Sequence, residues 1–287
     1  MEVPFTDSEL EEMPYYKPSS DSEEIKYLRE RREKLGGYLP TRKNTYSGFH
    51  MPKNSAFTEF DKGTPKEQEV STTMAFVRLL RNLMKDEKIG DLIVPIVPDE
   101  ARTFGMEALF TEFKIYNAQG QIYTPVDSQL LLSYKESESG QILEEGISEA
   151  GAMSSFTAAG MAYSTVGKPT IPFYIYYSMF GFQRVGDQIW CAADSRAKGF
   201  LLGATAGRTT LNGEGLQHQD GHSLLTATTV PNCISYDAAF AYEIGIIIKE
   251  GLRRMYENNE DLFYYLTLYN ENYPMPSIPK NSEEGII

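Results

Sequence analysis

The sequence is poor in the residues from which metal sites and disulfides are built. Its 287 residues include two cysteines, three histidines and one tryptophan. Cys191 and Cys233 are far apart in the chain and belong to no CxxC pair, so neither a zinc site nor a disulfide framework is indicated. We predict that both thiols lie in the core of a cytoplasmic protein, where the environment is reducing.

Excess positive charge and long apolar runs are also missing. Forty acidic residues against 27 basic ones give a formal net charge of -13, and no dense Lys/Arg stripe occurs. No stretch resembles a secretory signal or the run of about 20 apolar residues that crosses a membrane. Neither nucleic acid nor a membrane is therefore expected among the partners.

Two frequent catalytic signatures are absent as well. There is no GxSxG nucleophile elbow, because the nearest run, "AYSTVGK", lacks the first glycine. No GxxxxGKS/T phosphate loop occurs, and the GxG of "GEGLQHQDG" lies in a loop without a clear strand-to-helix context. A serine hydrolase and a nucleotide-binding protein therefore both lack support.

What is present is the composition of a globular protein, with 41% hydrophobic and 12% aromatic residues. Residues 1–70 are polar, and we predict an extended arm or connector there. It contains a short charged helix that Gly36 and Gly37 should end. The domain itself is expected at residues 71–287.

From Ser71 onward, helical and strand patterns alternate. Helices are predicted in "STTMAFVRLLRNLMKD", "ARTFGMEALFTEF", "QILEEGISEAGAM" and "DAAFAYEIGIIIKEGLRRMYEN", and strands in "DLIVPIVPDE", "TIPFYIYYSMF", "GFLLGATAG" and "LFYYLTLYN". A loop or hairpin is expected from Lys114 to Gly140. Such alternation is typical of an α/β fold, with a parallel sheet and helices on both faces.

Ligands of such sheets bind outside the carboxyl ends of the strands. Three segments rich in acidic, aromatic or histidine residues are expected to meet there. Asp99 and Glu100 follow the first predicted strand, and Tyr177 and Phe180 follow the second. The aromatic corner is compatible with a hydrophobic core, or with stacking on a flat heteroaromatic ligand.

The third segment is the glycine-rich loop "TAGRTTLNGEGLQHQDGHS". Its His218, Asp220 and His222 are compatible with ordinary loop packing, with a metal site, or with anion binding and proton exchange, since imidazoles titrate near neutrality.

Glu149 stands before a run of small and apolar residues, where a buried charge is costly. It is compatible with a helix cap or a salt bridge on a solvated face. Alternatively, a hydrogen bond to a ligand offsets the cost of its burial.

Five segments that occur in order carry a resemblance to a known family. They are "VPDEARTFGMEALF", "YTPVDSQLLLSYKESESGQILEEGISEAGA", "IPFYIYYSMFGFQRVGD", "GATAGRTTLNGEGLQHQDGHS" and "VPNCISYDAAFAYE". Together they resemble the middle domain of the homodimeric bacterial pyruvate dehydrogenases, the thiamin diphosphate-dependent decarboxylating component of the pyruvate dehydrogenase complex. The resemblance runs from about Glu2 through Ile287.

The resemblance implies a transketolase-like fold in which one domain binds the diphosphate, a second binds the aminopyrimidine, and a third ends the chain. This sequence is similar to the second domain and the connector before it. "GDQIW" at Gly186 lacks the glycine at the third position of the family's GDG signature, which, with an Asn pair, holds magnesium. We therefore expect a fragment of a longer thiamin diphosphate enzyme, whose magnesium ligands lie in the diphosphate-binding domain.

The resemblance also implies roles for individual residues. Glu149 matches the glutamate that bonds a ring nitrogen of the aminopyrimidine and stabilises its imino tautomer. Phe180 would stack on the pyrimidine, Tyr177 would line the same pocket, and Ile147 would press between the two rings of the cofactor. His218 resembles an active-centre histidine that interacts with the substrate or with the incoming lipoyl group.

Asp99 and Glu100 match acids near the active centre, while His50 does not match a histidine that the family uses from an upstream loop. The implied reaction is the oxidative decarboxylation of pyruvate, between glycolysis and acetyl-CoA, with acetyl transfer to a lipoyl-bearing dihydrolipoamide acetyltransferase. The implied assembly is a homodimer with active sites between subunits. Two alternatives remain: another transketolase-like enzyme, or, for the isolated chain, a noncatalytic interaction domain.

Overall fold

The computed structural model describes residues 4–37, 46, 48–98, 101–126, 134–207 and 215–287. Contacts within the chain divide it into two units, Met1–Arg42 and Lys43–Ile287. The first unit contains helices α1 (Asp7–Leu10) and α2 (Glu23–Lys34), neither of which buries a residue. The second unit contains the sheet and the helices that pack on it.

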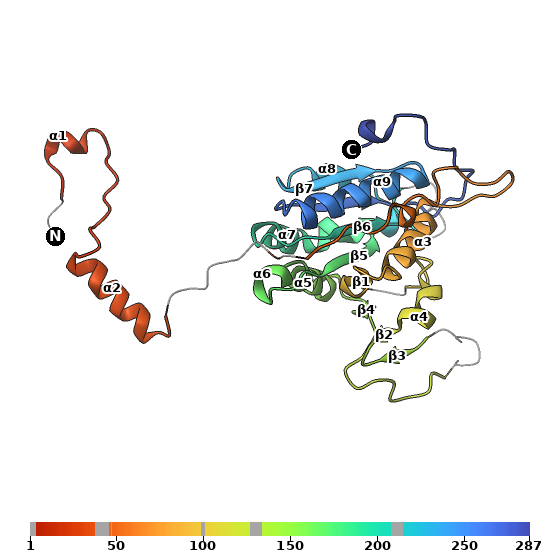
Figure 1. The fold of residues 1–287 in the computed structure, drawn as a ribbon, viewed down its shortest axis with the longest axis horizontal. Coiled ribbons are helices and arrows are strands. Elements are labelled where there is room, and N and C mark those ends of the chain that lie inside the picture. Colours follow the sequence, from red (N-terminus) through yellow and green to blue (C-terminus); the bar gives the residue numbers. More distant parts are fainter. Residues whose placement is uncertain (1–3, 38–45, 47, 99–100, 127–133, 208–214) are drawn as a thin grey trace. The chain divides into compact units, whose positions relative to one another are not determined.

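Parallel strands form the central sheet of the second unit, and their order across it is β4-β1-β5-β6-β8-β7 (Figure 1). Every residue of β6 and β8 is buried, as is typical of strands covered on both faces. The predicted α/β class is therefore confirmed. The strands are β1 (Ile93–Val97), β4 (Leu143–Glu144), β5 (Ile171–Tyr177), β6 (Phe200–Ala204), β7 (Cys233–Asp237) and β8 (Phe263–Thr267).

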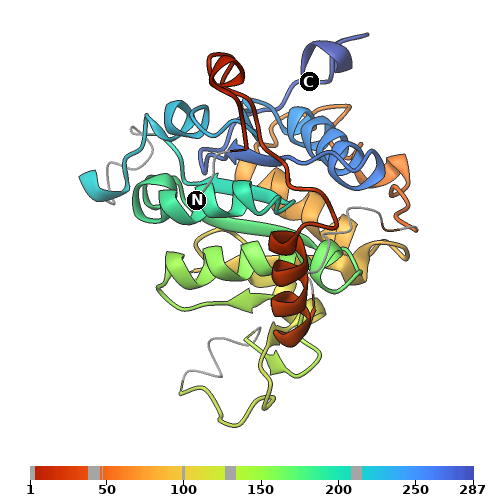
Figure 2. The same cartoon turned by 90° about the vertical axis from the view of Figure 1, so that its left-hand side faces the viewer.

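Helices cover both faces of this sheet (Figure 2). On one face, α5 (Glu149–Gly160) packs on α7 (Gly181–Asp194), which packs on α8 (Ser223–Ala227). On the other face, α3 (Thr72–Met84) packs on α9 (Ala241–Leu252). Right-handed crossovers explain why α9 lies on the face opposite to α5, α7 and α8. The chain moves in one direction across the sheet from β4 to β7 and then turns back to β8.

The described residues also form shorter elements. They are the helices α4 (Glu107–Phe113) and α6 (Ala162–Thr165), the 3-10 turns η1 (Asn54–Ala56), η2 (Gly90–Leu92), η3 (Ser178–Phe180), η5 (Leu216–His218) and η7 (Glu283–Gly285), and the π-helical turn η6 (Arg253–Glu257). Among the residues that the structure describes, no helix is both long enough and apolar enough to cross a bilayer.

The predicted helix after Ser71 shows how local sequence sets these elements. The Ser71 hydroxyl accepts a hydrogen bond from the Met74 amide at 3.1 Å, so the helix begins with a side-chain cap. Its apolar face buries Phe76, Leu80 and Leu83 completely. Similarly, α2 ends before Gly36 and Gly37, as predicted.

Several expectations were wrong. Of the loop or hairpin predicted from Lys114 to Gly140, the hairpin is wrong, because the strands β2 (Ile115–Tyr116) and β3 (Glu136–Ser137) pair in parallel and a hairpin joins antiparallel strands. The described residues between these two strands form a loop, which was the other alternative. The segment "QILEEGISEAGAM" opens with strand β4 rather than with a helix, and the helix begins only at Glu149. Cys191 is exposed, because α7 turns Ile189 and Ala192 inward instead; Cys233 is buried as predicted.

Lys198 is a buried charge just before the amino end of β6. Its Nζ donates to the Met255 carbonyl at 2.8 Å and to Asn259 Oδ1 at 2.5 Å, and it lies 4.6 Å from the centroid of the Tyr163 ring. Burial lowers the pKa of Lys198 to about 8. Met255 belongs to η6, the last helical turn before β8, and the carbonyls of a last turn lack intrahelical donors and can accept from side chains.

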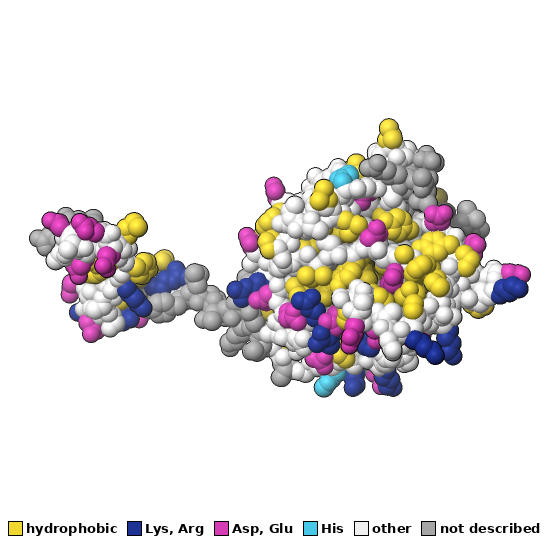
Figure 3. All heavy atoms as spheres, turned by 90° about the horizontal axis from the view of Figure 1, so that it is seen from above, with side chains coloured by type: hydrophobic (Ala, Val, Ile, Leu, Met, Phe, Trp, Pro, Cys, Tyr) yellow, Lys and Arg dark blue, Asp and Glu magenta, His cyan; other side chains and the backbone are white. Residues whose placement is uncertain are grey.

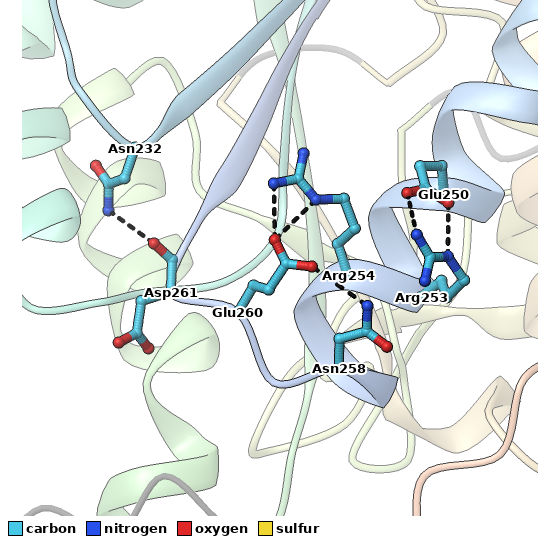
Figure 4. A network of polar contacts seen from close by, with 7 residues as sticks. All are labelled: Asn232, Glu250, Arg253, Arg254, Asn258, Glu260 and Asp261. Carbon is cyan, nitrogen blue, oxygen red and sulfur yellow. Dashed lines mark hydrogen bonds and ion pairs between the residues drawn. The ribbon is translucent and has the colours of Figure 1, made fainter. Parts of the chain in front are cut away.

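The chain between α9 and β8 is held by ion pairs (Figure 4). Arg254 donates from Nε and Nη2 to one oxygen of Glu260 at 2.8 and 2.7 Å, and Asn258 donates to the other oxygen at 3.3 Å. Arg253 instead pairs with Glu250, three residues earlier. Arg254 therefore links η6 to the residues just before β8, whereas Arg253 pairs only with a residue in the preceding turn of the helix.

Strand β7 forms one edge of the sheet, and its Ile234 and Tyr236 are only partly buried. Leu225 of the neighbouring α8 is 74% exposed. Figure 3, seen from above Figure 1, shows hydrophobic side chains gathered between charged ones on this side of the second unit.

Candidate active site

Glu149 is the first residue of α5, directly after β4 and its connecting loop. The cap of this helix is Ser148, whose hydroxyl accepts from the Gly151 amide at 3.1 Å. The Glu149 side chain is only 13% exposed, and its Oε1 accepts from Arg184 Nη1 at 2.8 Å. The salt-bridge explanation is thus partly right, but the carboxylate does not lie on a solvated face. The helix amino terminus and the guanidinium together stabilise its charge.

Arg184 is a member of the site that the sequence patterns did not reveal. It lies in the first turn of α7, and its Cζ is 3.8 Å from the centroid of the Phe180 ring, a cation–π contact. The signal was present in "FGFQR", since residues four apart in a helix lie on the same side. Arg184 therefore connects the acid of α5 to the aromatic corner after β5.

The aromatic corner is packed around His218. The Tyr177 and Phe180 rings are 5.9 Å apart, and the His218 ring lies 4.9 Å from the first and 5.5 Å from the second. Phe104 packs on Tyr177 from the other side, at 5.3 Å between ring centroids. The structure thus brings together four of the predicted residues, Glu149, Tyr177, Phe180 and His218, with Arg184 between them.

These groups meet because β4, β5 and β6 are parallel and their carboxyl ends share one edge of the sheet. Two further contacts fix the helices that carry them. Gln188 of α7 donates to the Ala150 carbonyl at 3.3 Å and to the Ser154 hydroxyl at 3.2 Å, which ties α7 to α5. Gly181 lets α7 begin against the buried Tyr176 ring, with which any Cβ at this position would collide.

A buried carboxylate holds the last part of the glycine-rich loop, residues 220–223. Asp220 is 3% exposed and accepts from the His222 amide at 3.0 Å, the Ser223 amide at 3.1 Å and the Ser223 hydroxyl. Burial raises the pKa of Asp220, but these hydrogen bonds outweigh it, so the net shift of the pKa is downward. Asp220 therefore acts in loop packing, and no cluster of three metal-ligating side chains occurs in the described parts of the chain.

Three predicted residues remain, Ile147, Asp99 and Glu100. Ile147 lies in the loop between β4 and α5, and its side chain is 84% exposed. Asp99 and Glu100, which follow β1, lie outside the described residues.

Comparison with solved structures defines the class of this fold. A transketolase from Pichia stipitis aligns with a TM-score of 0.60 over 82% of this chain and 30% of its own, at 16% identity. A transketolase from Campylobacter jejuni gives a TM-score of 0.54 over 78% of this chain and 29% of its own, also at 16% identity. The second unit therefore has a transketolase-like fold, as predicted.

Sequence comparison narrows this class to one family. Residues 53–276 match the family model described as the pyruvate dehydrogenase E1 component middle domain, and the chain belongs to that family. The pyruvate dehydrogenase E1 component of Pseudomonas aeruginosa is 56% identical over 286 residues, which are 100% of this chain and 32% of the relative. That of Escherichia coli K12 is 53% identical over 286 residues, 99% of this chain and 32% of the relative. The chain thus spans about a third of the length of the curated relatives it matches.

Proposed function

We propose that this chain forms the aminopyrimidine-binding part of a thiamin diphosphate-dependent pyruvate dehydrogenase. Residues 71–287 would be the pyrimidine-binding domain and residues 1–70 the connector before it. The observation that carries the proposal is that Arg184 contacts both a mostly buried carboxylate, Glu149, and the ring of Phe180. Family membership and the length of the relatives support it.

The side chains present suit an aminopyrimidine. Arg184 already places a planar, nitrogen-donating group against both Phe180 and Glu149. A flat ring that carries an N–H donor can use the same two partners: the face of an aromatic ring to stack on and a carboxylate to accept its hydrogen bond. In the proposed site, Phe180 would stack on this ring, Tyr177 would line the pocket and Ile147 would hold the cofactor bent. When bound, thiamin diphosphate would supply a nucleophilic carbon and an electron sink for decarboxylation.

Glu149 would share a proton with a ring nitrogen: its carboxyl would donate to that nitrogen in the amino form, and its carboxylate would accept from the N–H of the imino tautomer. Its low exposure favours this role, because few water molecules compete for the carboxylate. His218, packed on Tyr177 and Phe180, would face the substrate or the lipoyl group. Asp99 and Glu100 would add acids near the active centre.

Other components of the reaction would come from outside this chain. We expect magnesium and the diphosphate to be held by a separate diphosphate-binding domain, contributed across a homodimer. Pyruvate would be the substrate and a lipoyl-bearing dihydrolipoamide acetyltransferase the acceptor, in the cytoplasm.

A chimera tests the proposal. The 286 matching residues of the Pseudomonas aeruginosa E1 component would be replaced by this chain, and carbon dioxide release from pyruvate and acetylation of a lipoyl domain would be measured. The chimera should be active, and Glu149→Gln should lower turnover at least about 100-fold. The matched control is Glu112→Gln, which neutralises another Arg-paired glutamate outside the site.

A chimera that dimerises but releases no carbon dioxide would instead support the noncatalytic interaction domain. Activity on sugar phosphates rather than pyruvate would support another transketolase-like enzyme.

A further inference from the structure

We propose that Asp220 is a positioning residue, which fixes the end of the glycine-rich loop to the sheet and thereby holds His218 in the aromatic corner. This inference rests on the proposed function where it concerns turnover, because the step that uses His218 belongs to that function. The location of His218 is a property of the fold, and it can be tested without any reaction.

Both oxygens of the Asp220 carboxylate accept hydrogen bonds from the residues that follow it. One oxygen accepts from the His222 amide at 3.0 Å and from the Ser223 amide at 3.1 Å, and the other accepts from the Ser223 hydroxyl. This hydroxyl in turn accepts from the Tyr265 hydroxyl at 2.8 Å, and Tyr265 is a fully buried residue of β8. The carboxylate is therefore connected to the core of the sheet through Ser223.

Two further contacts hold the same short segment. The Asp220 amide donates to the Gly207 carbonyl at 3.0 Å, just after β6. The side chains of His222 and Gln183 form a hydrogen bond, and Gln183 lies in the first turn of α7. Residues 220–223 thus contact β8, α7 and the chain that leaves β6.

This segment limits where His218 can lie. His218 precedes Asp220 by two residues, so their Cα atoms are within about 7 Å of each other. The His218 amide donates to the Gly215 carbonyl at 3.2 Å, which closes the turn η5. The imidazole at the end of this turn packs on Tyr177 and Phe180. A backbone that is anchored at Asp220 therefore restricts the position of the imidazole in the aromatic corner.

Asp220→Asn keeps the size of the side chain but not its two acceptor oxygens. With one acceptor left, either the two backbone amides or the Ser223 hydroxyl loses a buried hydrogen bond. The end of the loop should then separate in part from the sheet, and His218 should move with it. A misplacement of about 1 Å can lower a rate by about 100-fold.

The first test reads the location of His218 by NMR of the 287-residue chain. The chain has three histidines, so each ring signal can be assigned by replacing one histidine at a time with glutamine. In the wild type, ring currents from Tyr177 and Phe180 should shift the His218 signals away from their random-coil values. Asp220→Asn should move these signals toward random-coil values.

The matched control is Asp237→Asn. Asp237 ends β7 and also accepts two side-chain hydrogen bonds, from Thr267 and from Tyr269. It has no printed contact with residues 220–223 that this substitution would remove, so the His218 signals should keep their wild-type positions.

The second test is a double-mutant cycle in the Pseudomonas aeruginosa chimera, with turnover measured as acetylation of a lipoyl domain. Asp220→Asn should lower turnover roughly 10-fold to 100-fold in the wild-type background. In a His218→Ala background it should lower turnover by less than about 3-fold, because the group that it positions is gone. A purely structural role would give the same fold-change in both backgrounds.

Ser223→Ala gives an independent variant. It keeps the carboxylate and removes only the connection to Tyr265, so both effects should appear in the same direction and be smaller. It decides the question by the same two measurements if Asp220→Asn does not fold.

The outcomes separate this inference from the proposed function. His218 signals that stay at their wild-type positions in both variants, or equal fold-changes in the two backgrounds, would overturn the positioning role and leave the proposed function intact. A wild-type chimera that dimerises but releases no carbon dioxide would overturn the proposed function. The NMR signals would then still decide whether Asp220 holds His218 in place.

Discussion

Lys198 should make the stability of the second unit depend on pH in an unusual direction. Burial lowers its pKa to about 8 from an ordinary value of 10.5. Between these values the unfolded chain binds a proton that the folded chain has lost. The free energy of unfolding should therefore rise with pH across this window, because the cost of burying the charge disappears.

The magnitude follows from the two pKa values. A separation of this size corresponds to about 3 kcal/mol over the whole window, of which about 2 kcal/mol falls between about pH 7.5 and about pH 9.5. Urea denaturation at several pH values, followed by circular dichroism, gives the free energy of unfolding. Many other groups titrate in this range, so the quantity of interest is the difference from a Lys198→Met variant.

Lys198→Met keeps much of the side-chain volume but carries no proton that titrates. The wild type should gain about 2 kcal/mol on the variant as the pH rises through that interval. The absolute stability of the variant does not matter, since the Met255 carbonyl and Asn259 also lose their donor. Parallel curves for the two proteins would refute the reasoning, because they would mean that the buried amine holds its proton as tightly as an exposed one.

Three further results are expected. Gly181→Ala should lower the free energy of unfolding by about 1 to 3 kcal/mol in urea denaturation, since the new Cβ would collide with the ring beneath it, whereas Gly186→Ala, with open space in the same helix, should be neutral or raise it by up to about 1 kcal/mol. Arg254→Ala should cost about 1 kcal/mol because it links two segments, and Arg253→Ala less than about 0.5 kcal/mol; equal costs would contradict this distinction. A thiol reagent should modify one cysteine per native chain, Cys191, and peptide mapping would identify it.

The parallel sheet and the helices α3 and α9 could be predicted because their signals are local, whereas α7 was not predicted. A few neighbouring residues are enough to predict a helix after the Ser71 cap, from its helical period, and a strand at β1, from its apolar run. The location of the site at the carboxyl ends of the strands also followed from the sequence, because alternating strands and helices predict parallel strands whose carboxyl ends lie together.

The errors arose where a structure depends on distant partners. β4 has only two residues, and its extended form depends on pairing with β1, which no local pattern reveals. The parallel pairing of β2 with β3 is equally nonlocal. Arg184 was missed because its importance comes from α5 packing on α7, which places it beside Glu149.

The two hydrogen bonds from Gln188 to α5 have a consequence for how such a site can change over time. They join α5, which carries the acid, to α7, which carries Arg184, and so help to hold the two helices in one relative position. Loops at the carboxyl ends of the strands could then be lengthened, exchanged or recombined without altering the relative position of α5 and α7. Substrate preference could diverge through the loops, while the acid keeps the geometry on which its chemistry depends.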